Sequence, residues 1–195
     1  MGLLSATLFA KVHVVTTYPY LGEIVKQVGE GQVSVIVLAN PKFDPHFIVP
    51  RPSLITKLRK ADLLVINGGQ LEIGWLPPLL RSAQNAKINV GTKGFLDVSG
   101  VIDMLDKPEK ASRAMGDVHP DGNPHFSLDP HNIGKIAQVI AANCRRSTRQ
   151  TVTSTKRVSP LFWKNGRTIF KSTMPKWRSA KPKKWCSIMI STTTS

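Results

Sequence analysis

The chain has 195 residues, 41% of them hydrophobic, which is enough apolar material for one buried core or slightly more. Its formal net charge of +15 would ordinarily suggest binding to nucleic acid or to an anionic membrane. The distribution argues against this for residues 1–143, where fourteen Lys and Arg stand against all twelve acids, whereas residues 144–195 hold thirteen Lys and Arg and no acid.

The first ten residues, MGLLSATLFA, close a short apolar run at Ala10 and resemble the end of a secretory signal. The run is too short to cross a bilayer, which takes about 20 apolar residues. We interpret residues 1–10 as the remnant of an export signal, with an ordinary buried first strand as the alternative. No Cys follows the run, so a lipid-anchored form is not supported.

Residues 11–91 alternate between strand-like and helix-like patterns. The first are short apolar runs rich in β-branched residues, and the second carry apolar residues at helical spacing. The expected strands are 11–18, 32–40, 62–68 and 87–91, and the expected helices are 20–29, 52–61 and 76–85. This order predicts an α/β domain with a parallel four-stranded sheet and helices on both faces. Ligands of such sheets bind at the carboxyl ends of the strands.

The pattern weakens over residues 96–121, which are polar and read as loop with one short turn of structure. A helix is expected next, because Asp129 is a good N-cap and Pro130 a good first helical residue. Its apolar stripe would be Ile133, Ile136, Ala137 and Ile140. We expect residues 129–143 to begin a long helix that leaves the first lobe.

Two histidines stand in similar loops, each after a proline and shortly before a helix start. His46 lies in FDPHFIVPRP and His125 in GNPHFSLDPHN. A proline before a loop histidine restricts the backbone and lowers the entropy lost on binding. Neutral imidazole is a common ligand of zinc and similar ions. We therefore predict that His46 and His125 bind one metal ion.

Four further polar side chains are weighed against this site. His119 could reach the same ion, although a solvated loop position is the preferred interpretation. Glu72 could place a carboxylate near the site, although a structural role is preferred. His131 is expected to form a local hydrogen bond next to Asp129, and His13 to pack in the core. No nucleophile and base pair, phosphate loop or carboxylate dyad stands out, so an enzyme is not predicted.

The segments FDPHFIVPRPSLITKLRKADLLVINGGQLEIGWLPPLL and GNPHFSLDPHNIGKIAQ resemble the metal-binding receptor proteins of bacterial ABC importers for zinc and manganese. The resemblance covers nearly all of residues 11–143, and the motifs DPHxxxPxPS and NPHFxLDP are specific. It implies two α/β lobes joined by one long rigid helix, with the ion held between them by three histidines and a carboxylate. By motif, His46 would be the first ligand and His125 the second.

The same resemblance implies a periplasmic protein that works with the membrane permease of an ABC importer. Residues 11–128 would be its N-terminal lobe, and the chain is expected to be a monomer that does not bind nucleic acid. The long His-rich loop of some zinc receptors is absent. Three histidines favour zinc modestly over manganese.

Residues 144–195 depart from the family, because they contain neither the third histidine nor an acidic ligand. Back-translated and read in another frame, SIMISTTTS permits HHDLYNYF, which is similar to the family's third-ligand motif. We expect residues 144–195 to be an out-of-frame, irregular basic tail that leaves metal binding truncated and impaired.

The competing interpretation is a nucleic-acid-binding protein that uses this basic tail. Its Lys and Arg would contact phosphates, and the indole rings would stack on bases. The indoles are Trp163, Trp177 and Trp185.

Overall fold

A computed structural model describes residues 11–29, 31–108 and 119–149 of the chain. The chain divides into two compact units, residues 1–156 and 157–195, and only the first contains described residues. The expected signal remnant and residues 150–195 of the expected tail lie outside them. Within the described ranges, no helix has the length and apolar character needed to cross a membrane.

Four parallel strands form one sheet in the order β2-β1-β3-β4. Their bounds are Val12–Thr16 for β1, Val33–Val37 for β2, Leu63–Ile66 for β3 and Phe95–Asp97 for β4. The chain leaves the central strand β1 for the edge strand β2 and then crosses back to β3 on the other side. All four residues of β3 are buried, as expected of a strand covered on both faces. The predicted parallel α/β class is confirmed.

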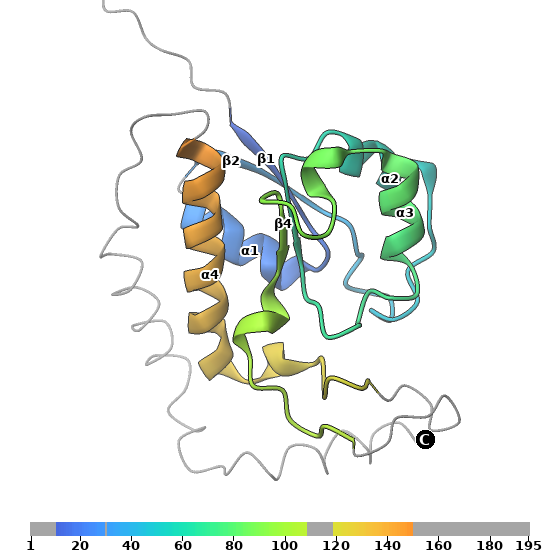
Figure 1. Ribbon diagram of the computed structural model, residues 1–195, viewed down its shortest axis with the longest axis vertical. Helices are drawn as coiled ribbons and strands as arrows, with labels where there is room; N and C mark the ends of the chain where they lie inside the picture. The colour runs from blue at the N-terminus through green and yellow to red at the C-terminus, as the bar shows by residue number, and fades with distance from the viewer. Residues whose placement is uncertain (1–10, 30, 109–118, 150–195) are drawn as a thin grey trace, which may run out of the picture. The chain divides into compact units, whose positions relative to one another are not determined.

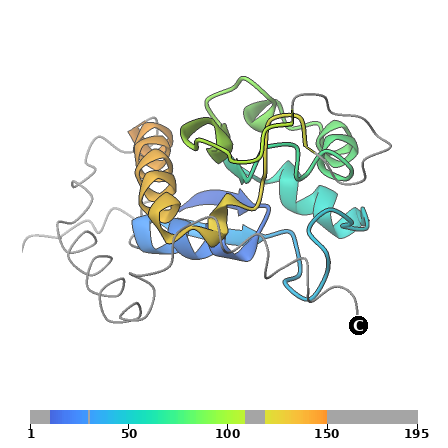
Figure 2. The same cartoon turned by 90° about the horizontal axis from the view of Figure 1, so that it is seen from below.

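Helices cover the two faces of this sheet (Figures 1 and 2). Helix α1 (Pro19–Gly29) packs against α4 (Pro130–Arg149), and α2 (Pro52–Arg59) packs against α3 (Leu76–Ala83). The apolar stripe of α1 is buried, which anchors the helix on the sheet. Its members are Leu21, Ile24, Val25 and Val28.

The strand expected at residues 87–91 is wrong. Ala86–Ile88 form the short 3-10 helix η1, in which the Asn85 side chain accepts the backbone N–H of Lys87 at 3.1 Å and turns the chain. Ile88 is fully buried whereas Val90 is 76% exposed, so this run gives the core one side chain without forming a strand. The fourth strand is β4, inside a segment that was expected to be mostly loop.

Helix α4 begins at Pro130, as predicted, but it extends six residues beyond the expected boundary at 143. Cys144 is buried and continues the stripe of Ile136 and Ile140 at helical spacing. Burial also raises the pKa of the Cys144 thiol to about 11. The ordered lobe therefore reaches past the residue at which the tail was expected to begin.

Candidate metal centre

The two predicted ligand loops meet at the carboxyl edge of the sheet. His46 lies between β2 and α2, and His125 immediately precedes the 3-10 helix η4 (Phe126–Leu128), which leads into α4. In the strand order β2-β1-β3-β4, β2 is added on one side of β1 and β3 on the other, so the order in which the chain adds strands switches between β1 and β3. Crevices at such a switch point are the usual ligand sites of open α/β sheets.

Three imidazole rings lie together at this edge. The ring centroids of His46 and His125 are 5.2 Å apart with the planes at 67°. The rings of His46 and His119 stack at 5.5 Å and 26°, with 3.4 Å between their Nε2 atoms. Two imidazole nitrogens on one tetrahedral zinc ion lie about 3.3 Å apart, given Zn–N bonds of about 2.0–2.1 Å. The Nε2 separation therefore suits two ligands of one ion.

The preferred interpretation of His119 as a solvated loop residue is not supported. Its ring is half-buried against His46, because the segment from residue 119 to 125 turns back toward the His46 loop. Across residues 11–29, 31–108 and 119–149, no three His, Cys, Asp or Glu side chains are arranged so that they could hold an ion as they stand. The described lobe thus brings the three imidazole rings together without forming such an arrangement.

Asp44 holds His46 at two points. Its Oδ1 accepts the backbone N–H of His46 at 2.8 Å and lies 2.9 Å from His46 Nδ1. The hydrogen bond from the backbone and then that from the ring lower the pKa of Asp44. The carboxylate is therefore well suited to stay ionised beside the histidine.

The His46 loop is also held through the carbonyl oxygen of Pro45. This oxygen accepts one hydrogen bond from the Tyr18 hydroxyl at 3.0 Å and a second from Trp75 Nε1 at 3.2 Å. The two aromatic rings are buried and meet edge to face at 6.4 Å. Desolvation raises the pKa of Tyr18, which keeps its hydroxyl protonated and able to donate.

The His125 loop is held through the carbonyl oxygen of Pro124, the residue before His125. Asn67 Nδ2 donates to this oxygen at 3.0 Å, and the hydroxyl of Tyr20 donates to Asn67 Oδ1 at 2.6 Å. Asn67 follows β3 directly and is 1% exposed. A buried amide at the end of β3 therefore ties the sheet to the residue before His125.

Glu72 supports the His125 loop indirectly, through Asn67. Its carboxylate accepts hydrogen bonds from Thr17 Oγ1 at 2.7 Å and from the backbone N–H groups of Asn67 at 2.8 Å and Gly68 at 3.1 Å. Burial raises the pKa of Glu72 to about 7.

The turn after Asn67 requires glycine at position 68. Gly68 has φ of 78°, and a Cβ there would collide with the Asp97 carboxylate.

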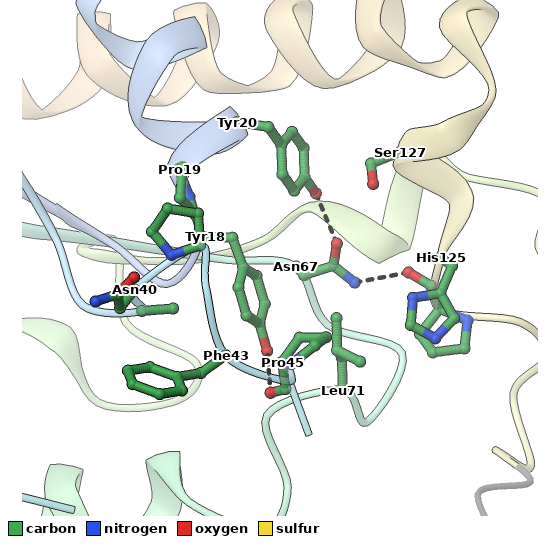
Figure 3. A pocket seen from close by; sticks show the side chains of 13 residues that line it. Tyr18, Pro19, Tyr20, Asn40, Phe43, Pro45, Asn67, Leu71, His125 and Ser127 are labelled. Atoms are coloured by element: carbon green, nitrogen blue, oxygen red, sulfur yellow. Dashed lines mark hydrogen bonds between the residues drawn. The ribbon is translucent and has the colours of Figure 1, made fainter. Parts of the chain in front are cut away.

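A pocket of about 220 Å³ opens beside His125, between the two ligand loops (Figure 3). Its wall is mainly apolar and includes Tyr18 and Tyr20, the two tyrosines whose hydroxyl groups donate to the supports of the loops. Residues lining it include Tyr18, Tyr20, Phe43, Pro45, Asn67 and Leu71. Three of the supporting residues, Tyr18, Tyr20 and Asn67, thus line the pocket itself. Neither these three nor Trp75 was predicted from the sequence.

The remaining two histidines lie outside the cluster. His131 forms the predicted local contact, with Nδ1 2.8 Å from Asp129 Oδ1. The prediction that His13 packs in the core is wrong, because its side chain is exposed on β1. Its backbone N–H donates to the Asp62 carboxylate at 3.1 Å.

A family model described as the periplasmic component A of the zinc-uptake complex, ZnuA, matches residues 14–150. The manganese ABC transporter substrate-binding lipoprotein scaA of Streptococcus gordonii is 28% identical over 135 residues, 68% of this chain and 40% of the relative. The high-affinity zinc uptake system protein ZnuA of Bacillus subtilis is 29% identical over 121 residues, 62% of this chain and 35% of the relative. The chain therefore spans about two fifths or less of the length of these two relatives, the first of which is named a substrate-binding lipoprotein.

Solved structures of similar fold support the α/β assignment. The metal-dependent lipoprotein YcdH of Bacillus subtilis has a TM-score of 0.56 at 24% identity, covering 83% of this chain and 51% of that structure. The Mn-bound periplasmic metal binding protein of Candidatus Liberibacter asiaticus has a TM-score of 0.54 at 22% identity, covering 83% and 53%. At these identities the likeness concerns the fold alone.

Proposed function

This chain belongs to the ZnuA family of periplasmic zinc-uptake components, and we propose that it captures a divalent transition metal ion outside the cytoplasm for an ABC importer. The observation that carries the proposal is the meeting of His46 and His125 at the carboxyl edge of the sheet, with ring centroids 5.2 Å apart. The ion is the cargo, and the partner that receives it is a membrane permease. The receptor is proposed to act as a monomer in the periplasm.

Zinc is the proposed ion in preference to manganese. Imidazole nitrogen suits zinc well, whereas carboxylate, carbonyl and water oxygens suit manganese. The relatives named above include a manganese protein and a zinc protein, so the choice rests on the donor atoms of this chain. A titration of the full chain with each ion tests it, and tighter binding of manganese than of zinc would reverse the assignment.

Alanine variants of the two predicted ligands test the site. His46→Ala and His125→Ala should each weaken zinc binding about 100-fold, since a lost ligand commonly removes several kcal/mol. His131→Ala is the matched control, because His131 also follows an Asp-Pro pair but lies 81% exposed outside the cluster. The measurement is calorimetric titration at pH 7. Parent-like affinity in both site variants would refute the assignment.

His119 is proposed as the third nitrogen of this lobe, and Glu72 as a structural support and not a ligand. The first assignment rests on the 3.4 Å between the Nε2 atoms of His119 and His46. His119→Ala should then weaken zinc binding by about tenfold or more. An unchanged affinity would remove His119 from the ligand set and leave the other two histidines in place.

We also propose that the reading frame changes in the last quarter of the chain. The support is the absence of acids and histidines from residues 144–195. The sequence suggested that the change lies near Asn143. Helix α4 continues to Arg149 and the family match to residue 150, which favours a position later in the chain than Asn143. Such a chain would hold part of the ligand set and bind zinc weakly. Independent sequencing of the gene tests this, and an intact frame in every read would refute it.

The competing nucleic-acid role depends on residues 144–195, most of which lie outside the described residues. It therefore stays an alternative prediction. Salt-dependent binding of the full chain to single-stranded DNA would support it.

A further inference from the structure

The tripeptide Asp-Pro-His occurs at residues 44–46 and again at 129–131, with the same local geometry. In the first copy the Asp Oδ1 lies 2.8 Å from the histidine backbone N and 2.9 Å from Nδ1. In the second copy these distances are 2.9 Å and 2.8 Å. The proline fixes φ, and an Asp side chain readily accepts from the backbone two residues on. The geometry therefore follows from the tripeptide and not from its surroundings.

The two copies differ in what surrounds the ring. The side chain of His46 is 17% exposed, whereas that of His131 is 81% exposed. The two carboxylates are similarly exposed, Asp44 at 54% and Asp129 at 51%, so the copies differ at the histidine ring and not at the aspartate. The second ring nitrogen of His46, Nε2, faces His119 at 3.4 Å. The first copy of the motif thus places its histidine in the cluster of imidazole rings, and the second copy places its histidine in solvent.

We propose that Asp44 is a positioning residue that keeps the proton of neutral His46 on Nδ1, so that Nε2 offers its lone pair to the cluster. An ionised carboxylate can only accept hydrogen bonds, so the 2.9 Å contact requires a donor at Nδ1. A metal ion binds the imidazole nitrogen that carries no proton, and a partner on the other nitrogen selects that tautomer. The identity of the ion at Nε2 rests on the proposed function, whereas the tautomer does not.

The tautomer is tested by ¹⁵N NMR of the histidine rings in the metal-free full chain at a pH where they are neutral. The parent should show a protonated Nδ1 and an unprotonated Nε2 on His46. Asp44→Ala should shift His46 toward the other tautomer, and Asp44→Asn should retain part of the preference because the amide oxygen still accepts. Asp129→Ala is the matched control and should change only the signals of His131. A parent His46 protonated on Nε2, or a tautomer unaffected by Asp44→Ala, would overturn the proposal.

Zinc titration of the same variants tests the consequence. Asp44→Ala should bind zinc 10- to 100-fold more weakly, the usual loss for a partner of a ligating histidine, and Asp44→Asn should fall between it and the parent. Asp129→Ala should bind like the parent. If Asp44→Ala shifts the tautomer but binds zinc as tightly as the parent, the role of Asp44 in metal binding is refuted. If the parent shows the expected tautomer and binds no zinc, the role of Asp44 at His46 holds and the proposed function fails.

Discussion

The loops of His46 and His125 are both held at the carbonyl oxygen of the proline before the histidine, but with different numbers of donors. Pro45 receives two hydrogen bonds from buried aromatic side chains, whereas the one side-chain donor found for Pro124 among the described residues is Asn67. Asn67 in turn is held by the Tyr20 hydroxyl, which donates to its side chain, and by the Glu72 carboxylate, which accepts its backbone N–H.

This difference indicates how each loop can fail. Two independent donors make the His46 loop tolerant of losing one, because the proline oxygen stays satisfied. The His125 loop depends on a chain of polar groups, in which losing one member leaves others buried without a partner. Substitutions along that chain should therefore have larger effects than substitutions around Pro45.

The largest effect is expected for Asn67→Ala. The change leaves the Pro124 oxygen and the Tyr20 hydroxyl without this partner, so the free energy of unfolding should fall by about 3 kcal/mol. Because the His125 loop then loses its tie to β3, zinc binding should also weaken by about tenfold. Urea unfolding and zinc titration measure the two effects.

Asn85→Ala is the control for Asn67→Ala. The Asn85 amide donates to the carbonyl oxygens of Leu58 and Ala61 at 2.9 and 2.8 Å, away from the histidines. Its loss should lower stability and leave zinc affinity unchanged. Equal losses of zinc affinity in the two variants would mean that Asn67 acts through general stability and not through the His125 loop.

A smaller effect is expected from the titration of Glu72. Burial raises its pKa to about 7 from an ordinary value of 4.5, so the folded state favours the protonated form. Its stabilising contribution is full below pH 4.5 and is lost as the pH rises through 7, by about 2 kcal/mol in total between pH 5 and 8. Glu72→Gln should remove this part of the pH dependence in denaturant unfolding.

Glu23→Gln is the matched control, since Glu23 is exposed and pairs with Lys26 at 2.7 Å on the helix surface. Its unfolding curve should keep the pH dependence of the parent. A Glu72→Gln variant that keeps it as well would show that the carboxylate is already ionised in the folded lobe, where its three donors would favour the charge.

Local signals in the sequence predicted much of this fold. Pro130 marked the start of α4, apolar spacing marked the buried faces of α1 and α2, and continuous apolar runs marked the first three strands. The fourth strand was placed wrongly at residues 87–91, because a short apolar run does not distinguish a strand from 3-10 structure and the turn at Asn85 decided the outcome.

The candidate site was predictable only in part. His46 and His125 could be paired from the sequence, because carboxyl ends of parallel strands share one edge. Their supports could not, since Asn67 and Pro124 are 57 residues apart and only the folded chain brings them together. A polar residue directly after a buried strand is a signal that could have singled out Asn67. His119 needed the path of its loop, which its sequence does not determine.

The smallest effects are expected for two hydroxyl deletions, one on each loop. Tyr18→Phe should lower stability by less than about 1 kcal/mol, because Trp75 still donates to the Pro45 oxygen. Tyr20→Phe should have the larger effect, about 1 kcal/mol, because it removes the 2.6 Å bond to Asn67 Oδ1 inside the polar chain. Thermal unfolding of both variants with and without zinc measures the difference. If Tyr18→Phe is the more damaging, the Pro45 oxygen depends on the tyrosine alone, and the contrast between a doubly held and a singly held loop is wrong.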